Sequence, residues 1–288
     1  MRKVKWEEMF PDEMLAAIEE HPVCYMAYGL AEPHGAYNAI GLDWLKAYAL
    51  CRETAETHGG VLAPPLCWHI QETPAFDWPR RMGTPQSLCS SMPADLFYHF
   101  LFHQLRVFDA RGFHAAVLVT GHYGGVERDM RLACEYYRRR SGSPLQVHCI
   151  ADYECMNFEN YSGDHAGMCE TQQLMAFRPE LVDLSRKEPS PQSGSWCGFV
   201  KPGQTPVAEV GRKIVASQIE ALGRVQKDLL AAYRPNPGWT VPNQNQVDEY
   251  WRSFERLTRK YWVCSTTWSE YNESRGAPPF PGWEALGA

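Results

Sequence analysis

Short apolar runs alternate with longer amphipathic segments along the first 235 residues of the chain. Four runs have the continuous apolar character of strands that are buried on both faces of a sheet, at residues 23–28, 61–63, 115–120 and 145–150. Segments with helical spacing lie around them, at residues 12–20, 42–58, 93–111, 126–140, 169–177 and 204–233. This alternation predicts βαβ units, and therefore a three-layer α/β fold with helices on both sides of a mostly parallel central sheet.

The chain changes character after about residue 235. Pro, Asn and Trp become dense there, around one further predicted helix at residues 247–261. Residues 187–205, before the change, are rich in Pro, Ser and Gly, which is typical of a long surface loop. We therefore predict one α/β domain, residues 1–235, and an irregular and helical C-terminal extension, residues 236–288, that packs on the domain or on a neighbouring subunit.

Composition excludes several classes of protein. Hydrophobic residues make up 44% of the 288 residues, enough for a substantial core, and the net charge is −6. A nucleic-acid-binding protein normally presents a basic face, so this charge argues against one. No apolar run has the length of a membrane span and the N-terminus turns acidic where a signal peptide would be apolar, so we expect a cytoplasmic protein without a membrane partner. The ten cysteines have no CxxC spacing and are expected to be reduced.

Ionisable residues cluster where open α/β sheets place their binding crevices, beyond the strand ends and at the starts of helices. The clusters contain Glu32, His34 and Asp43, then His122, then His165 and Glu170. Each has an ordinary explanation when taken alone, since a histidine after a strand is commonly structural and Asp43 suits a helix N-cap. Together, imidazoles and carboxylates at strand-to-helix transitions match the ligand needs of a pair of divalent cations.

The order and spacing of these clusters resemble the creatininase (creatinine amidohydrolase) family. That family has a Gly-Ser-x-Glu-x-His-Gly stretch with an Asp nine residues after the His, then a Gly-His-x-x-Asn stretch, then a His-Ala-Gly-x-x-Glu-Thr-Ser stretch. This chain has Gly-Leu-Ala-Glu-Pro-His-Gly at residues 29–35 with Asp43 nine residues after His34, Gly-His-Tyr-Gly-Gly at residues 121–125, and His-Ala-Gly-Met-Cys-Glu-Thr at residues 165–171. The resemblance covers about residues 20–235 and implies a creatininase-like fold.

The resemblance implies a site for two divalent metal ions. The ligands that it implies are Glu32, His34, Asp43 and His122, with Asp43 bridging the two ions. Creatininase itself has a further Glu where this chain has Gly124, and we expect Glu170 to complete the metal shell and take part in catalysis instead. Ligands of these types suit Zn, Mn and Fe alike.

The resemblance also implies roles for residues around the metals. His165 matches the family's proposed proton donor to the leaving amine, and Tyr123 matches an aromatic position beside the substrate. Tyr161 stands where creatininase has a tryptophan, and Trp68 and His69 lie in a segment that lines the pocket in the family, with His69 as a substrate contact or a polar residue at the rim. Family members form homo-oligomers, often hexamers, so we expect a homo-oligomer.

The chain departs from the family pattern in its pocket and not in its metal ligands. Ala31 and Pro33 lie within the first motif, Asn38 stands in a stretch that is usually apolar, and Val126 replaces the usual Asn of the second motif. We therefore expect a small-molecule substrate other than creatinine. A water between two cations would become nucleophilic near neutral pH, and His165 could protonate the departing nitrogen. The predicted function is metal-dependent hydrolysis of a non-peptide C–N bond, in a cyclic or formyl amide.

Three other functions fit the same sequence. A metallopeptidase acting on a short or modified peptide would use the same metal chemistry, helped by the aromatic residues of the extension. A non-catalytic binding protein on this fold would hold little metal and have an inert pocket. A cysteine hydrolase would use Cys169 with His165, although that pair would compete with the role of Glu170.

Overall fold

In the part of the chain that the structure describes, four parallel strands form the central sheet, in the order β2–β1–β3–β4. The computed structural model describes residues 2–70, 88–123, 125–156, 163–187, 200, 203–262 and 279–287. The strands are β1 (Val23–Tyr28), β2 (Val61–Leu62), β3 (Ala115–Thr120) and β4 (Gln146–Ala151), and each neighbouring pair runs parallel. The predicted α/β class with a parallel sheet is therefore confirmed.

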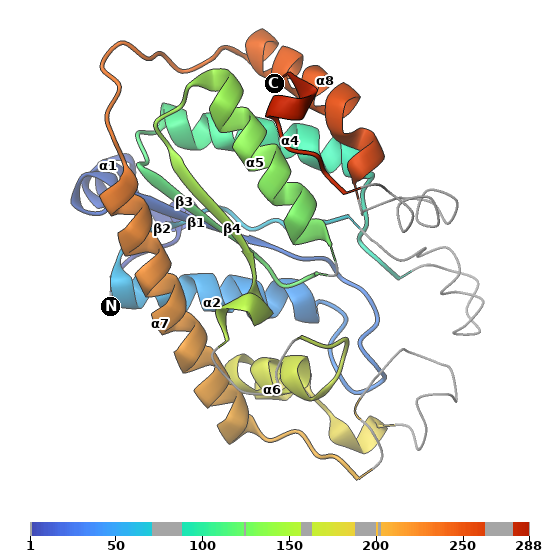
Figure 1. The fold of residues 1–288 in the computed structure, drawn as a ribbon. Coiled ribbons are helices and arrows are strands. Elements are labelled where there is room, and N and C mark those ends of the chain that lie inside the picture. The colour runs from blue at the N-terminus through green and yellow to red at the C-terminus, as the bar shows by residue number, and fades with distance from the viewer. Residues whose placement is uncertain are drawn as a thin grey trace.

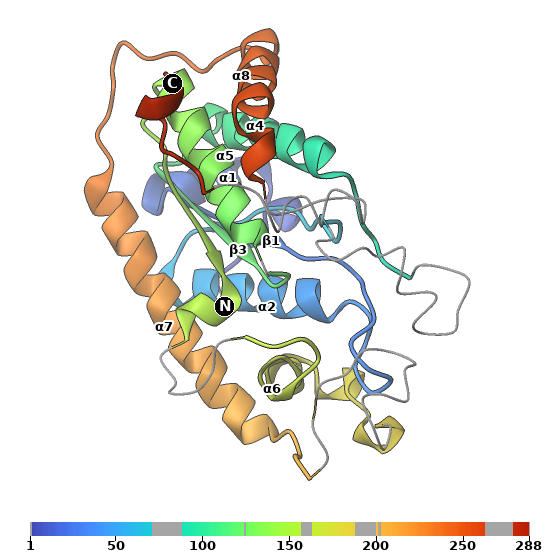
Figure 2. The same cartoon turned by 45° about the vertical axis from the view of Figure 1, so that its right-hand side comes forward.

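Helices cover both faces of this sheet (Figure 1). One face packs against α1 (Pro11–Glu20), α4 (Ala94–Ala110) and α5 (Val126–Ser141), and the other against α2 (Leu42–His58) and α7 (Ala208–Ala232). α6 (Met168–Phe177) lies beside α2 and α7 (Figure 2). Side chains of β1 alternate between these two cores, with Met26 in the first and Tyr25 in the second. Both faces are covered, which explains why β1 and β3 are almost entirely apolar and fully buried.

The C-terminal part of the chain adds a helix over α4 and α5. This helix, α8 (Gln244–Thr258), begins after Asn243, whose side chain accepts a hydrogen bond from the backbone N–H of Gln246. It lies against α4 and α5 (Figure 1), and Val247, Trp251 and Phe254 join the core formed by those helices. Within the described residues, the short 3-10 helices are Trp6–Glu8, Asp152–Cys155, Pro179–Leu181, Leu184–Arg186, Arg259–Tyr261 and Glu284–Leu286. The predicted domain boundary at residue 235 stays a prediction.

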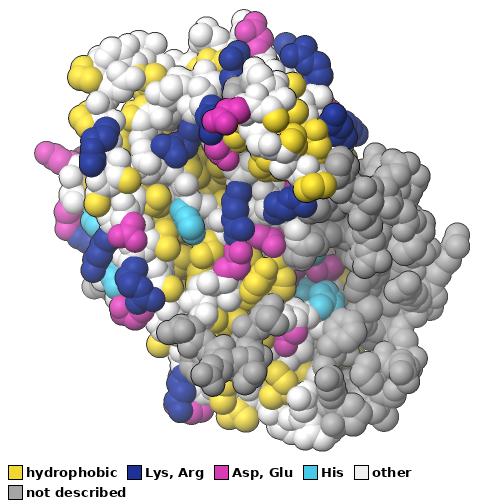
Figure 3. All heavy atoms as spheres, in the orientation of Figure 1, with side chains coloured by type: hydrophobic (Ala, Val, Ile, Leu, Met, Phe, Trp, Pro, Cys, Tyr) yellow, Lys and Arg dark blue, Asp and Glu magenta, His cyan; other side chains and the backbone are white. Residues whose placement is uncertain are grey.

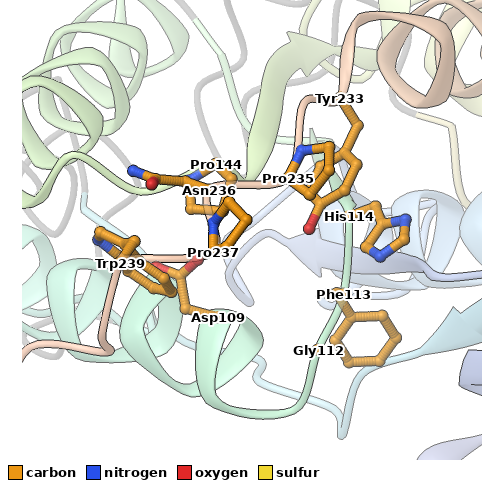
Figure 4. Close-up of a pocket in the computed structure, with 10 residues that line it drawn as sticks. All are labelled: Asp109, Gly112, Phe113, His114, Pro144, Tyr233, Pro235, Asn236, Pro237 and Trp239. Atoms are coloured by element: carbon orange, nitrogen blue, oxygen red, sulfur yellow. The ribbon is translucent and has the colours of Figure 1, made fainter.

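A hollow of about 220 Å³ lies where the chain leaves α7 (Figure 4). His114 and Pro144 in its wall precede β3 and β4, so it lies at the amino-terminal edge of the sheet. The ring of Tyr233 stacks on His114 with centroids 3.8 Å apart, and the indole of Trp239 donates to the carbonyl of Ser141. These contacts hold the segment between α7 and α8 against the loops that precede β3 and β4.

The described surface shows no segregation of charge on the face in Figure 3 and no membrane-spanning helix. On the face shown in Figure 3, Lys and Arg side chains stand among Asp and Glu side chains and form no separate patch there. No helix within the described residues has the length and apolar character to cross a bilayer. The cysteines that the structure describes as free thiols are Cys24, Cys51, Cys67, Cys89, Cys134, Cys149, Cys155 and Cys169.

Candidate metal centre

The first turn of α2 lies directly against the carboxyl ends of β1 and β3. Two glycines allow this contact: a Cβ on Gly29 would lie 2.5 Å from the backbone nitrogen of Trp44, and a Cβ on Gly121 would lie 2.1 Å from the carbonyl oxygen of Asp43. The N-cap residue of α2 is Gly41, and Asp43 lies inside the helix. The N-cap explanation of Asp43 is therefore wrong, and its carboxylate instead faces the strand ends.

The carboxylate of Asp43 lies between two histidines. Its Oδ1 is 2.9 Å from His34 Nε2, and its Oδ2 is 3.2 Å from His122 Nδ1. Glu32 Oε1 is 3.1 Å from the same nitrogen of His122, and Glu170 Oε2 is 3.6 Å from His34 Nε2. All five side chains are buried. The structure thus brings together every residue that the sequence analysis expected as a ligand.

These five residues form two groups of possible ligand atoms that share Asp43. One group is Glu32, Asp43 and His122, the other is His34, Asp43 and Glu170, and within each group the ligand atoms lie within 4.8 Å of one another. A carboxylate common to two such groups suits a bridging ligand between two ions. The donor types, imidazole nitrogen and carboxylate oxygen, are those that Zn and Mn accept.

The orientation of His34 fits a metal ligand. Its Nδ1 donates to the carbonyl of Glu32 at 2.9 Å, which leaves Nε2 facing Asp43 and Glu170, where a metal ion could replace its proton. Within the described part of the chain, His34 Nε2 is buried without a hydrogen-bond partner. Burial alone would lower the pKa of His34, but the Asp43 carboxylate raises it to about 9. A divalent ion would satisfy both the orphaned nitrogen and the concentrated negative charge.

A buried lysine, absent from the sequence analysis, lies behind these carboxylates. Lys46 Nζ is 2.6 Å from Glu170 Oε1 and 3.1 Å from Asp152 Oδ2, and none of these side chains is more than 2% exposed. Burial raises the pKa of Asp152 to about 7, although Lys46 opposes the shift. Lys46 therefore pairs with two of the buried carboxylates, Asp152 and Glu170, while Glu32 and Asp43 face the histidines.

Two sequence features would have pointed to this lysine and its partner. Asp152 directly follows β4, at the same edge of the sheet as the residues that were selected. Lys46 is three residues after Asp43 in α2, which places both on one face of the helix.

The segment before α6 places His165 beside His34. Asp164 accepts hydrogen bonds from the backbone N–H groups of Cys169 and Glu170, and Glu170 Oε2 accepts one from the backbone N–H of Ala166 at 2.7 Å. The rings of His165 and His34 have centroids 4.4 Å apart.

His165 has one ring nitrogen held and the other directed at the carboxylates. Its Nε2 donates to the carbonyl of Pro33 at 3.1 Å, and its Nδ1 lies 3.8 Å from Glu32 Oε1. The side chain is 26% exposed, unlike the buried histidines next to it. A small molecule bound at the cluster can therefore reach this ring.

Of the residues expected to contact the substrate, Tyr123 lies beside the cluster and Trp68 lies at the surface. The ring of Tyr123 lies against Lys46, with the ammonium 4.7 Å from the ring centroid, and its hydroxyl donates to the carbonyl of Asp164. Trp68 is 51% exposed. Tyr161 and Gly124 lie outside the described residues.

His69 lies behind the cluster and not at a solvent-exposed rim. The residue is fully buried, its Nδ1 accepts a hydrogen bond from the backbone N–H of Ile70, and its ring stacks on Phe97. Its ring centroid is 5.8 Å from that of His122. This placement makes His69 a packing partner of His122.

An open hollow of about 190 Å³ adjoins the cluster. Pro33 and His34 form one wall, and Asn38, Leu88 and Arg186 form others. The side-chain amide of Asn38 donates to the carbonyl of His34 and to the hydroxyl of Thr171. Asn38, which stands in a stretch that is usually apolar in the family, therefore stabilises the loop that carries His34.

The geometry around Cys169 argues against a cysteine nucleophile. Its sulfur contacts the sulfur of Met156 at 3.6 Å and accepts a hydrogen bond from the side-chain amide of Gln173. Burial raises the pKa of the thiol, whereas a nucleophilic cysteine needs a lowered one.

Comparison with known proteins gives consistent matches. The family model "Creatininase: Creatinine amidohydrolase" matches residues 7–225. A creatinine amidohydrolase of Pseudomonas putida is 22% identical over 191 residues, which are 57% of this chain and 67% of that protein.

Solved structures share the fold at low sequence identity. A crystal structure of creatinine amidohydrolase superposes with a TM-score of 0.66 at 18% identity, covering 82% of this chain and all of the other. A creatininase described with Mn gives a TM-score of 0.64 at 18% identity, covering 81% of this chain and 100% of that one. A mutant creatininase of the Zn–Zn type gives 0.62 at 18% identity, covering 82% and 100%. These likenesses show a shared fold.

Proposed function

Because the chain belongs to the creatininase family, whose members are metal-dependent amidohydrolases, we propose that it uses two divalent metal ions to hydrolyse a non-peptide C–N bond, in a small cyclic or formyl amide other than creatinine. Family and enzyme class agree with the sequence analysis, and both are confirmed by the family match. The observation that carries the proposed two-metal site is the Asp43 carboxylate, with one oxygen 2.9 Å from His34 and the other 3.2 Å from His122.

Each of the two ligand groups would hold one ion. Glu32, Asp43 and His122 would hold the first, and His34, Asp43 and Glu170 the second. When bound, such ions supply a water that is nucleophilic near neutral pH and a positive charge for the developing oxyanion. Zn, Mn and Fe all suit these donors, and solved creatininases described with Mn and Zn–Zn support the first two.

The remaining residues would orient these groups and move a proton. His165 is fixed by its hydrogen bond to the Pro33 carbonyl, so its Nδ1 faces the site as an acceptor, where it can take a proton from the attacking water and pass it to the departing nitrogen. Lys46 holds Glu170 through Oε1, which leaves Oε2 directed at His34. Lys46 is thus a positioning residue for the ligand from α6.

The proposed substrate follows from the surroundings of the ligands. Glycine occupies position 124, where creatininase has a glutamate, and Asn38 lies in the wall of the hollow beside His34. A hollow of about 190 Å³ suits a small molecule better than an extended peptide. We also propose that the protein is a homo-oligomer, as the resemblance implies, and gel filtration with light scattering tests this.

Elemental analysis of purified variants tests the metal assignment. We expect Asp43→Ala to lose two metal ions per chain relative to the unaltered protein, because both groups share this carboxylate, and Glu170→Ala to lose one. Glu180→Ala serves as the matched control, since Glu180 is an exposed acid shortly after α6. Equal metal content in all four proteins, after reconstitution with Zn²⁺ or Mn²⁺, would contradict the proposal.

A substrate panel then tests the bond that is cleaved. Cyclic amides, formamides, creatinine and short peptides are incubated with the metal-loaded protein, and amine release is measured. Hydrolysis of cyclic or formyl amides alone supports the proposal. Cleavage of peptides would replace it with a metallopeptidase, and metal binding without any hydrolysis would favour a binding protein.

A further inference from the structure

Two histidines of α4 and one aspartate of α8 converge in a group that shares no residue with the cluster described above. His99 and His103 are four residues apart in α4, so their side chains leave the same face of the helix. Both Nε2 atoms meet one oxygen of Asp248, Oδ1, at 2.8 Å and 3.0 Å. The ring centroids of the two histidines are 5.1 Å apart. Three ligand atoms of the types that Zn²⁺ prefers thus lie together.

The spacing of these atoms is close to that of a zinc site. Bonds of about 2.0–2.2 Å in a tetrahedral arrangement put neighbouring ligand atoms about 3.3 Å apart. The observed separations of 2.8 Å and 3.0 Å therefore need to open by only a few tenths of an ångström. His99, His103 and Asp248 are 37%, 32% and 29% exposed, so an ion can enter and water can fill a fourth position.

The surroundings hold these side chains in place. Trp251, three residues after Asp248 in α8, stacks on the ring of His99 with centroids 5.4 Å apart and an interplanar angle of 12°. The same tryptophan packs into the core between α4 and α8. The ring of His99 is therefore oriented by the helix that supplies the carboxylate.

We propose that His99, His103 and Asp248 form a Zn²⁺ site that joins α8 to α4. α4 lies within residues 7–225, which match the family model, and α8 lies outside them. The bound ion would tie the C-terminal helix to the family core, in addition to the apolar contacts of Trp251 and Phe254. The site is independent of the proposed catalytic ions, since it shares no residue with them.

Zinc counting in the Asp43→Ala background isolates this site. We expect one Zn²⁺ per chain in Asp43→Ala and none when His103→Ala is added. Zn²⁺ at a hundredfold excess over its dissociation constant should raise the Tm of Asp43→Ala by about 5–10 °C, and His103→Ala should abolish that rise. Co²⁺ substituted for Zn²⁺ should give the visible absorption of a tetrahedral site that His103→Ala removes.

Two further variants distinguish a zinc site from a hydrogen-bonded triad. Asp248→Asn keeps an oxygen that can accept from both rings but removes the anionic ligand, so zinc should be lost. Glu249→Gln, an exposed neighbour in α8, should change neither zinc content nor Tm. Unchanged zinc content in both Asp248→Asn and His103→Ala would overturn the proposal. If instead Asp43→Ala leaves the zinc count of the unaltered protein intact while His103→Ala lowers it by one, the catalytic assignment fails and this site stands.

Discussion

Replacing Lys46 with methionine tests the charge arrangement behind the candidate metal centre. Methionine fills a similar volume but has no charge, so Glu170 and Asp152 would lose the ammonium that lies 2.6 Å and 3.1 Å from their oxygens. Lys46 is fully buried, and removing one partner of a buried ion pair typically costs about 3–5 kcal/mol. Burial already raises the pKa of Asp152 to about 7, so this carboxylate can take up a proton and reduce the cost of the unpaired buried charge. We therefore expect a loss near the low end, about 3 kcal/mol.

Urea unfolding of the chelated protein, followed by circular dichroism, measures this loss. A change of about 3 kcal/mol corresponds to a fall in Tm of about 6–12 °C for a chain of this size. Lys227→Met is the matched control, because Lys227 is exposed on α7, and it should change the free energy of unfolding by less than about 0.5 kcal/mol. Adding Asp152→Asn to Lys46→Met should recover part of the loss, because one unpaired carboxylate is removed.

Two results would refute this reasoning. Lys46→Met with the stability of Lys227→Met would show that the buried ammonium does not offset the carboxylates. Additive losses in the Lys46→Met, Asp152→Asn double variant would show that the two residues do not interact energetically.

Three more predictions concern the same centre. Gly121→Ala should distort the start of α2 and lower metal content, because its Cβ would lie 2.1 Å from the backbone of Asp43. Gly41→Ala is the control, since its Cβ would make only ordinary contacts, and elemental analysis compares the metal content of the two variants. Cys169→Ala should keep full hydrolytic activity, while a chelator abolishes it until Zn²⁺ or Mn²⁺ is restored; thiol-dependent activity would contradict the metal mechanism. His165→Asn should lower kcat by about 10²–10⁴-fold with unchanged metal content, and equal kcat values would remove His165 from the reaction.

The strands could be located from sequence because both of their faces are covered. β1 was expected at residues 23–28 and is observed there, since every side chain in it is buried. β4 was expected one residue earlier than its observed range, Gln146–Ala151. It is an edge strand with several partly exposed side chains, so its apolar pattern marks its ends less sharply.

Helix α8 begins and ends three residues earlier than the sequence predicted. It was expected at residues 247–261, on its apolar spacing, but begins at Gln244. The side chains of Asn243 and Gln246 form a reciprocal capping box with each other's backbone N–H groups, a signature that apolar periodicity does not register. At its other end, Arg259–Tyr261 turn as a 3-10 helix.

The candidate site was predictable where it depends on strand ends and unpredictable where it depends on helix packing. Glu32 and His122 follow β1 and β3, which are neighbours in a parallel sheet, so their proximity follows from the strand pattern. Lys46 lies in a helix, and a lysine there is ordinarily exposed. Lys46 is buried because α2 packs closely against the sheet, which places Asp43 between the two strand ends. Lys46 lies three residues later on the same face of α2, so the same contact covers it. The approach that makes Asp43 available to two histidines is therefore also what buries Lys46, so the carboxylates and their ammonium are two results of one backbone contact.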